Sequence, residues 1–409
     1  MQYGFLIILA AFIHHVIYSG IVFSFNILHV YIVEEYKTTA TMSGLTGTIG
    51  LSVYHLASLL SSTVFTRIGH RRAVIVGVLL SCTGLFMSAF VTTIQLLWVS
   101  FGVFTAGGGS LVTLTCMNMA VVYYPGSFCK RVICLVLCGT STGVMVLPLI
   151  IETLLLSLGW KASILVLASS FLFVGVALAF IYRLPEDTST KDNQEQHDNK
   201  EQMEKLNEDM TPTESSLSST SPSSLKIQLW IYVKMFSRVE CWLLSIGFFI
   251  TAVTITFTFV NMGSLMKSNA IGESKITYIL TLMGVADLVT RVLLSAAVSH
   301  LPISTTLAFS LTSILATIPT YLLTVFGSYT GMFTLSMLIS VARTILYSLV
   351  LTVCVEVFGV RFAGQSIGIA YAVIGVGSLS STFVSDVMYV KTGSYQESLY
   401  LCVGHTVSS

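Results

Sequence analysis

Two oppositely charged residues lie inside a stretch of the chain that is otherwise apolar enough to cross a lipid bilayer. Asp287 and Arg291 fall within residues 276–298, four positions apart, so on a helix they share one face and can form an ion pair. Asp287 lies eleven residues into the stretch, which is about 16 Å along a helix and near the middle of a bilayer. Ionisable side chains at that depth are costly and usually line a pathway or a binding site. The pattern therefore indicates a site for a substrate or a proton, or an ion pair that only locks two helices together.

A third charge at membrane depth is Arg343, about twelve residues into the apolar stretch 331–355. Glu356, the acid that follows it, is thirteen positions further on, so Arg343 has no acid on its own helix face. Such an arginine favours an anionic ligand, because a guanidinium can hold a carboxylate through two parallel hydrogen bonds. In the alternative interpretation Arg343 reaches Asp287 from a neighbouring helix and leaves Arg291 without a role.

The composition places these residues in an all-α polytopic membrane protein. Hydrophobic residues make up 54% of the 409-residue chain and charged residues 10%, whereas soluble domains carry about 25% charged residues. The net charge of +1 gives no reason to expect nucleic-acid binding. The eight cysteines show neither zinc-ligand spacing nor a disulfide framework. No nucleophile–base set, phosphate loop or metal-ligand cluster is evident, so we expect no enzymatic activity, no cofactor and no metal.

Eleven apolar stretches are long enough to span a bilayer as helices. They are residues 4–33, 42–65, 73–92, 94–122, 132–157, 162–182, 241–266, 276–298, 302–326, 331–355 and 362–390. We expect a twelfth helix to begin near Tyr395, but only about half of the length needed to cross remains before Ser409. A truncated gene model is one explanation of that incomplete helix.

A polar segment divides these spans into two groups. Residues 183–240 hold 18 of the 39 charged residues and a Ser/Thr/Pro-rich tract, a composition that cannot bury a core and indicates a disordered linker. The expected domains are a six-helix bundle over 1–182, the linker over 183–240, and a second bundle over 241–409 with its last helix incomplete. Two bundles of six helices are typical of transporters built from repeats. Glycines four apart in the fifth span, Gly139 and Gly143, and in the eleventh, Gly364 and Gly368, allow close helix packing.

The distribution of positive charge predicts the orientation, because cytoplasmic loops are enriched in Lys and Arg. The cations on one side are Arg67, Arg71, Arg72, Lys130, Arg131, Arg183, Lys226, Lys234, Arg238 and Arg361, and those opposite are Lys37, Lys161, Lys267, Lys275 and Lys391. We therefore expect the N-terminus and the linker in the cytoplasm.

The turn between the second and third spans, residues 67–72, resembles a motif of the major facilitator superfamily. Arg67, Gly69 and Arg71 fit its G-x-x-x-D-R-x-G-x-R pattern, and Thr66 stands where the acid would be. Glycine allows the tight turn, and the arginines can pair with acids or helix C-termini that separate when the protein changes state. The alternative interpretation is simple anchoring by positive charge on the cytoplasmic side.

A more specific resemblance, to the monocarboxylate-transporter family of that superfamily, covers nearly the whole chain except the linker. The motifs that carry it are Tyr3-Gly4-Phe5, Tyr123-Tyr124 followed by Lys130-Arg131, Gly139 with Gly143, Gly159-Trp160-Lys161, Gly284-Val-Ala-Asp287-Leu-Val-Thr-Arg291 and Glu356-Val-Phe-Gly359. The resemblance implies the two-bundle (6+6) fold, a carboxylate or amino-acid-like substrate and a plasma-membrane location. It also implies gating roles for Lys130 and Arg131 and a single-pass accessory glycoprotein of the immunoglobulin type as a partner.

One departure from the family bears on the driving ion. Proton-coupled members carry a lysine in the first helix where this chain has Phe23, so the resemblance is to divergent or orphan branches. Asn26, nearby, could hydrogen-bond a substrate. His14, His15 and His29 lie in the same span and are either proton carriers or packing residues.

Together these features predict a secondary transporter that moves a small organic anion or zwitterion by alternating access. Asp287, Arg291, Arg343, Asn26 and Phe23 are the expected substrate-site residues. The alternative function is that of a non-transporting relative serving as a binding, sensing or assembly partner.

Overall fold

A computed structural model describes residues 2–38, 40–124, 127–183, 232–298, 303–359 and 362–392. Throughout these ranges the regular structure is helical. Most of the expected linker and the stretch after residue 392, where a twelfth helix was expected, lie outside the described residues. Residues 232–240, the end of the expected linker, are described, and they lead into the first helix of the second half.

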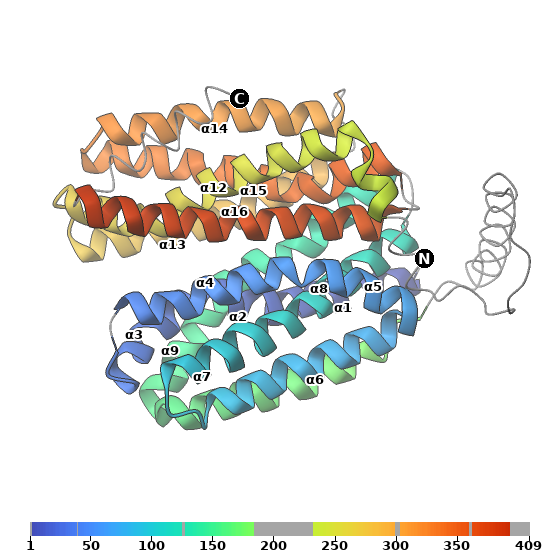
Figure 1. Cartoon of the computed structure of the whole chain (residues 1–409), viewed down its shortest axis with the longest axis horizontal. Coiled ribbons are helices and arrows are strands. Elements are labelled where there is room, and N and C mark those ends of the chain that lie inside the picture. The colour runs from blue at the N-terminus through green and yellow to red at the C-terminus, as the bar shows by residue number, and fades with distance from the viewer. Residues whose placement is uncertain are drawn as a thin grey trace, which may run out of the picture.

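The helices form two groups that follow the order of the chain, one from each half (Figure 1). The N-terminal group contains α1 (Gln2–His14), η1 (His15–Ser19), α2 (Gly20–Phe23), α3 (Phe25–Glu35), α4 (Ala40–Leu56), α5 (Ser58–Ile68), α6 (His70–Ser88), α7 (Ile94–Leu97), η2 (Trp98–Thr105), α8 (Ala106–Tyr123) and α9 (Ser127–Ala179). The C-terminal group contains α12 (Val239–Ser268), α13 (Glu273–Ala297), α14 (Thr305–Val325), α15 (Tyr329–Phe358) and α16 (Ala363–Thr392). We call these groups the N-terminal and the C-terminal bundle.

The described helices accommodate the eleven predicted spans. Within the described ranges, nine helices are long and apolar enough to cross a membrane, and α4 with α5 forms a further span bent by 44°. One of the nine lies within α9 and is 52 residues long, about 78 Å and more than twice the apolar thickness of a bilayer. The break that divides it is at Gly159, whose φ of 72° and ψ of 175° are not helical. Glycine suits this position because it adopts positive φ without steric penalty.

The side chains of α13 show how the apolar runs become membrane helices. Val289 and Leu293 are 50% and 63% exposed, whereas Asp287 and Arg291 on the other face are 6% and 7% exposed. Large apolar side chains so exposed indicate a surface that lipid covers. The charged face therefore turns inward, away from the hydrocarbon.

The paired glycines allow close contacts, but in different places. A Cβ at Gly139 or Gly143 would collide with the backbone of the first span, at Phe12 and Val16. Gly368 instead faces α5 of the other bundle, and the Ser58 hydroxyl donates a 2.8 Å hydrogen bond to its carbonyl oxygen. Glycine spacing thus packs helices within the N-terminal bundle in one case and between bundles in the other.

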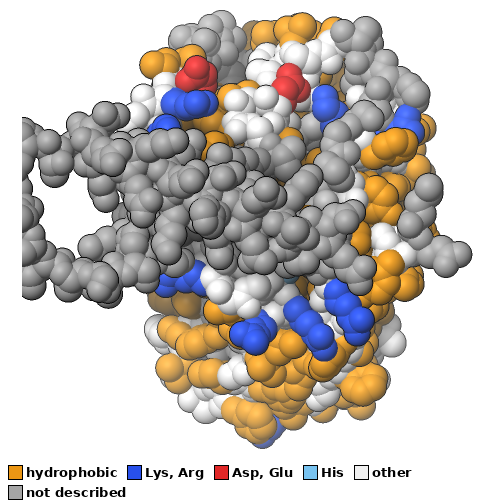
Figure 2. Space-filling view, turned by 90° about the vertical axis from the view of Figure 1, so that its right-hand side faces the viewer, with side chains coloured by type: hydrophobic (Ala, Val, Ile, Leu, Met, Phe, Trp, Pro, Cys, Tyr) orange, Lys and Arg blue, Asp and Glu red, His pale blue; other side chains and the backbone are white. Residues whose placement is uncertain are grey.

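The two bundles also meet at the end of the molecule where the N-terminus lies. There Lys130 of α9 lies 3.8 Å from Glu356 of α15, and the hydroxyls of Ser62 and Tyr232 are 2.5 Å apart. Figure 2 looks onto this end and shows several Lys and Arg side chains gathered there.

Candidate functional site

Asp287 is the centre of the buried polar site and contacts both intramembrane arginines. The Arg291 Nε donates to Asp287 Oδ2 at 3.3 Å within α13, and the Arg343 Nη2 of α15 lies 3.5 Å from Asp287 Oδ1. The spacing of four on one helix produces the first pair as predicted. The second pair joins two helices of the C-terminal bundle.

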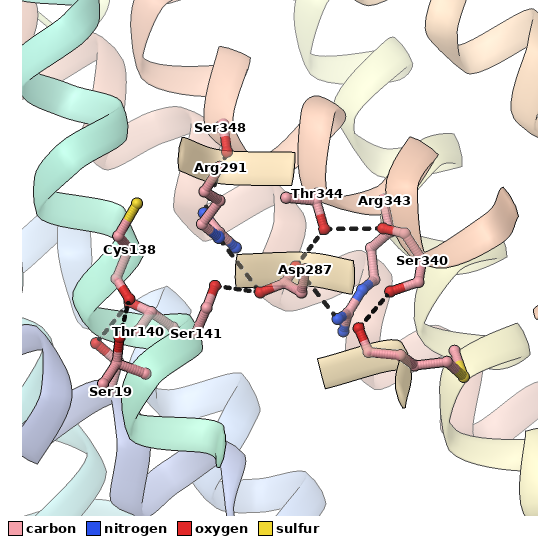
Figure 3. A network of polar contacts seen from close by, with 12 residues as sticks. Ser19, Cys138, Thr140, Ser141, Asp287, Arg291, Ser340, Arg343, Thr344 and Ser348 are labelled. Atoms are coloured by element: carbon pink, nitrogen blue, oxygen red, sulfur yellow. Dashed lines mark hydrogen bonds and ion pairs between the residues drawn. The ribbon is translucent and has the colours of Figure 1, made fainter. Parts of the chain in front are cut away.

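Hydroxyl groups complete the surroundings of this carboxylate (Figure 3). Ser141 of α9 donates to Asp287 Oδ2, and Thr344 of α15 donates to Oδ1. Arg291 Nη1 in turn donates to the Ser348 hydroxyl at 3.1 Å. Asp287 therefore accepts hydrogen bonds from Arg291 and two hydroxyls and forms an ion pair with Arg343, and these interactions offset the cost of burying its charge.

The geometry combines the two interpretations of Arg343. This arginine does reach Asp287, as the alternative interpretation held, but Arg291 keeps its own contact with the same carboxylate. Figure 3 shows Asp287 lying between the two arginines. The structure thus brings both arginines to one carboxylate, and the role of each stays a prediction.

A cavity lies beside this network and draws its wall from both bundles. Its empty space is about 600 Å³, counting the part that opens to solvent. Of the three charged residues Asp287, Arg291 and Arg343, it is Arg291 that lines the cavity. Rings form much of the remaining wall, namely His15, Phe23, Tyr54, His55, Tyr347 and Tyr371. A guanidinium set among rings in a mostly apolar cavity is the arrangement expected for binding a small organic anion.

Phe23 lies in the cavity wall, where its ring centroid is 5.9 Å from that of Tyr54 and 6.2 Å from that of His55. Phe23 thus contributes an apolar surface to the cavity. Asn26 belongs to α3, but its side chain lies outside the described residues, as does that of His29.

The two described histidines of the first span have different surroundings. His14 packs within the N-terminal bundle, where its Nε2 lies 3.2 Å from the Gly175 carbonyl oxygen and its Nδ1 3.2 Å from the Tyr182 hydroxyl. His15 lines the cavity. The packing interpretation therefore describes His14, whereas His15 is available to a ligand.

The predicted gating residues lie in the turns at one end of the bundles. Gly69 joins α5 to α6 with a φ of 82°, which allows the tight turn. The Arg71 guanidinium lies 4.5 Å from the centre of the Phe180 ring, and that of Arg131 lies 5.8 Å from the Phe128 ring. Arg67, in the last turn of α5, is exposed. Among these residues Lys130 makes an ion pair with the other bundle.

Sequence reasoning missed the hydroxyl groups and His55. Ser141 lies between Gly139 and Gly143 of α9, a segment from which the sequence predicted only close helix packing. Ser340, Thr344 and Ser348 are four residues apart on α15, so they form a polar stripe on one face of an apolar helix. This pattern in the sequence indicates which face of α15 meets Asp287.

Comparisons with known proteins agree with this architecture. The family model described as Major Facilitator Superfamily matches residues 7–382. In a solved structure of the proton:xylose symporter XylE bound to 6-bromo-6-deoxy-D-glucose, the match covers 99% of this chain and 94% of that one, with a TM-score of 0.70 and 15% identity. At that identity the likeness shows the fold.

Several monocarboxylate transporters of low identity are among the curated relatives. Monocarboxylate transporter 13 of Rattus norvegicus is 25% identical over 46% of this chain and 44% of its own length. Monocarboxylate transporter 12 of the same organism is 21% identical over 63% and 52%, and monocarboxylate transporter 10 of Homo sapiens is 34% identical over 32% and 25%. The chain thus spans about half or less of the length of these relatives. It is a multi-pass membrane protein that belongs to the Major Facilitator Superfamily, and the relatives to which it is similar include monocarboxylate transporters.

Proposed function

We propose that this protein is a secondary transporter that moves a small carboxylate or amino-acid-like solute, with Arg291 holding the carboxylate group. The observation that carries the proposal is the position of Arg291. Its guanidinium is buried and lines the cavity between the bundles, and its charge is only partly compensated, because Asp287 also forms an ion pair with Arg343 and accepts from Ser141 and Thr344. A substrate carboxylate would supply the missing negative charge and would accept hydrogen bonds from the buried Arg291 guanidinium.

The links between the bundles support alternating access. The cavity wall combines residues of η1, α2, α4, α5, α8 and α9 with residues of α13, α15 and α16, so rocking of one bundle against the other would open it to either side in turn. Ser141 joins the N-terminal bundle to the carboxylate that orients Arg291. Substrate binding at Arg291 would therefore affect the contact between the two bundles, which has to change during transport.

The other proposed site residues act around Arg291. Arg343 contributes through Asp287, which lies between the two arginines. Phe23 offers its ring to the apolar part of the substrate, and Asn26 is proposed as a hydrogen-bonding residue on the sequence alone. Since a phenylalanine replaces the family's lysine, we propose that transport depends only weakly on a proton gradient.

We further propose a plasma-membrane location with the N-terminus and the linker in the cytoplasm. The support is the Lys and Arg side chains gathered at the end where the N-terminus lies (Figure 2). An immunoglobulin-type single-pass accessory glycoprotein is proposed on family resemblance.

The test is uptake by cells that express the full chain and have low background transport. Radiolabelled carboxylates and zwitterionic amino acids are compared with the uncharged amides of the same acids. We expect saturable uptake of at least one carboxylate and at least tenfold less of its amide. Surface-expressed protein that takes up none of them, or takes up acid and amide equally, would contradict the proposal, and binding without uptake would favour a sensing role.

A further inference from the structure

Two histidines of the N-terminal bundle face the cavity with the same hydrogen-bonding arrangement. His15 of η1 and His55 of α4 both line it. The Nδ1 of His15 lies 2.9 Å from the carbonyl oxygen of Ala11, and the Nδ1 of His55 lies 2.8 Å from that of Leu51. Each ring is therefore anchored to the backbone one helical turn earlier.

This anchoring determines which ring nitrogen carries the proton. A carbonyl oxygen only accepts, so Nδ1 is the donor in each ring, and the Nε2 of a neutral imidazole is then an acceptor. Within the part of the chain that the structure describes, neither Nε2 has a hydrogen-bond partner. The cavity wall thus offers two nitrogen acceptors for groups that enter it.

The same wall limits the shape of a ligand near His55. The centroid of this ring is 5.4 Å from that of Tyr54, 6.2 Å from that of Phe23 and 5.9 Å from that of Tyr371. Rings at these separations leave apolar faces and edges around the imidazole. A donor group attached to an apolar body fits this corner better than a large hydrated group.

We propose that His15 and His55 are specificity residues that accept hydrogen bonds from an N–H or O–H group of the transported solute. The inference rests on the proposed function, with the carboxylate held by Arg291. It narrows the substrate to carboxylates that also carry a donor group, either a hydroxyl or an ammonium. A carboxylate without the donor leaves both nitrogens unpaired when the cavity closes, and sites built around such a bond reject analogues that lack it.

The experiment compares three acids that share a phenyl ring and a three-carbon chain. 3-Phenylpropanoate has no donor, 2-hydroxy-3-phenylpropanoate has a hydroxyl, and phenylalanine has an ammonium. Uptake efficiency, as Vmax/KM, is measured for each with the full chain in cells, so the donor-free acid is the internal reference. A preference of at least tenfold for either donor-bearing acid is expected, and the preferred one identifies the donor.

Variants then assign the preference to the two rings. His15→Phe and His55→Phe keep a flat ring without nitrogen. The ratio of Vmax/KM for the donor-bearing acid to that for 3-phenylpropanoate should therefore fall towards unity, while uptake of 3-phenylpropanoate persists. His15→Gln and His55→Gln supply an amide oxygen as acceptor and should retain part of the preference. His14→Gln is the matched control, because His14 is satisfied within its own bundle, and its preference should equal that of the wild type.

The outcomes separate the two proposals. Equal uptake of all three acids by the wild type, or an unchanged preference in both Phe variants, overturns the role of the histidines and leaves the transport proposal standing. A preference for the donor-free acid also overturns it, because acceptors that need a donor from the solute would favour the opposite order. Absence of uptake for every acid contradicts the proposed function itself, and the inference falls with it.

Discussion

Ser141 of the N-terminal bundle donates a hydrogen bond to the carboxylate of Asp287 in the C-terminal bundle. The same carboxylate contacts Arg291 and Arg343, so the charged network and the interface between the bundles share one residue. We therefore expect a change at the proposed substrate site to be coupled through Asp287 to a change in the relative position of the bundles.

Removing the Ser141 hydroxyl should impair transport without removing the site. A hydrogen bond to a charged group contributes about 1.5–3 kcal/mol, so Ser141→Ala should change Vmax or KM for a transported acid by roughly tenfold or more. The matched control is Thr142→Ala, because the Thr142 hydroxyl bonds Cys138 of its own helix. Equal kinetics for the two variants would show that the link between the bundles has no part in transport.

Arg291→Ala should abolish carboxylate uptake while the protein still reaches the cell surface. Because removing one partner of a buried ion pair costs about 3–5 kcal/mol, misfolding has to be separated from loss of the site. The double variant Asp287→Asn/Arg291→Gln removes both charges and should recover surface expression without recovering uptake. Normal uptake by Arg291→Ala would exclude Arg291 as the carboxylate ligand.

Substitutions of Arg343 should act through Asp287. Arg343→Lys keeps the charge but loses the planar fork of donors, so we expect a several-fold rise in KM with normal protein levels. Arg343→Gln should abolish uptake, because Asp287 then loses one of its two cationic partners. Saturation kinetics normalised to surface protein measure both effects, and wild-type kinetics in both variants would make Arg343 purely structural.

The ion pair between Lys130 and Glu356 should favour the conformation in which the bundle ends around it are closed. Both side chains are about one-third exposed, so the pair contributes at most about 1 kcal/mol, which still changes a two-state ratio about fivefold. Lys130→Glu should speed thiol labelling of a cysteine introduced at the cavity residue Ser58, with reagent added on the Lys130 side.

The control for that labelling experiment is Arg72→Glu, which makes the same charge change at an exposed position of α6. If both variants label at the same rate, general surface charge explains the effect and the ion pair does not.

Uptake should depend weakly on an inward proton gradient, because Phe23 occupies the position of the lysine found in proton-coupled relatives. Initial rates are measured at external pH 6 and pH 8, with and without a protonophore. We expect these rates to differ by less than about twofold, a much smaller effect than the tenfold change that about 1.4 kcal/mol would produce. A many-fold increase at pH 6 that the protonophore abolishes would refute this, and His15 or Asp287 would become the residues to test for proton transfer.

Local features of the sequence determined the helices and the first ion pair. Apolar runs of about 20 residues form membrane helices because unpaired backbone groups are costly in hydrocarbon. Asp287 and Arg291 meet because a spacing of four places them on one helix face, whatever the rest of the chain does. The same locality made Gly69 recognisable as a position where a tight turn could form.

Tertiary structure alone decided which distant side chains share the site. Arg343 and Ser141 reach Asp287 from α15 and α9, and His55 reaches the cavity from α4. Their approach depends on how each helix is rotated and how the bundles pack, which helix periodicity does not specify. Serine, threonine and histidine are also tolerated at many helix positions. Only the distances in the folded structure distinguish the side chains that surround Asp287 and Arg291 from those that merely pack.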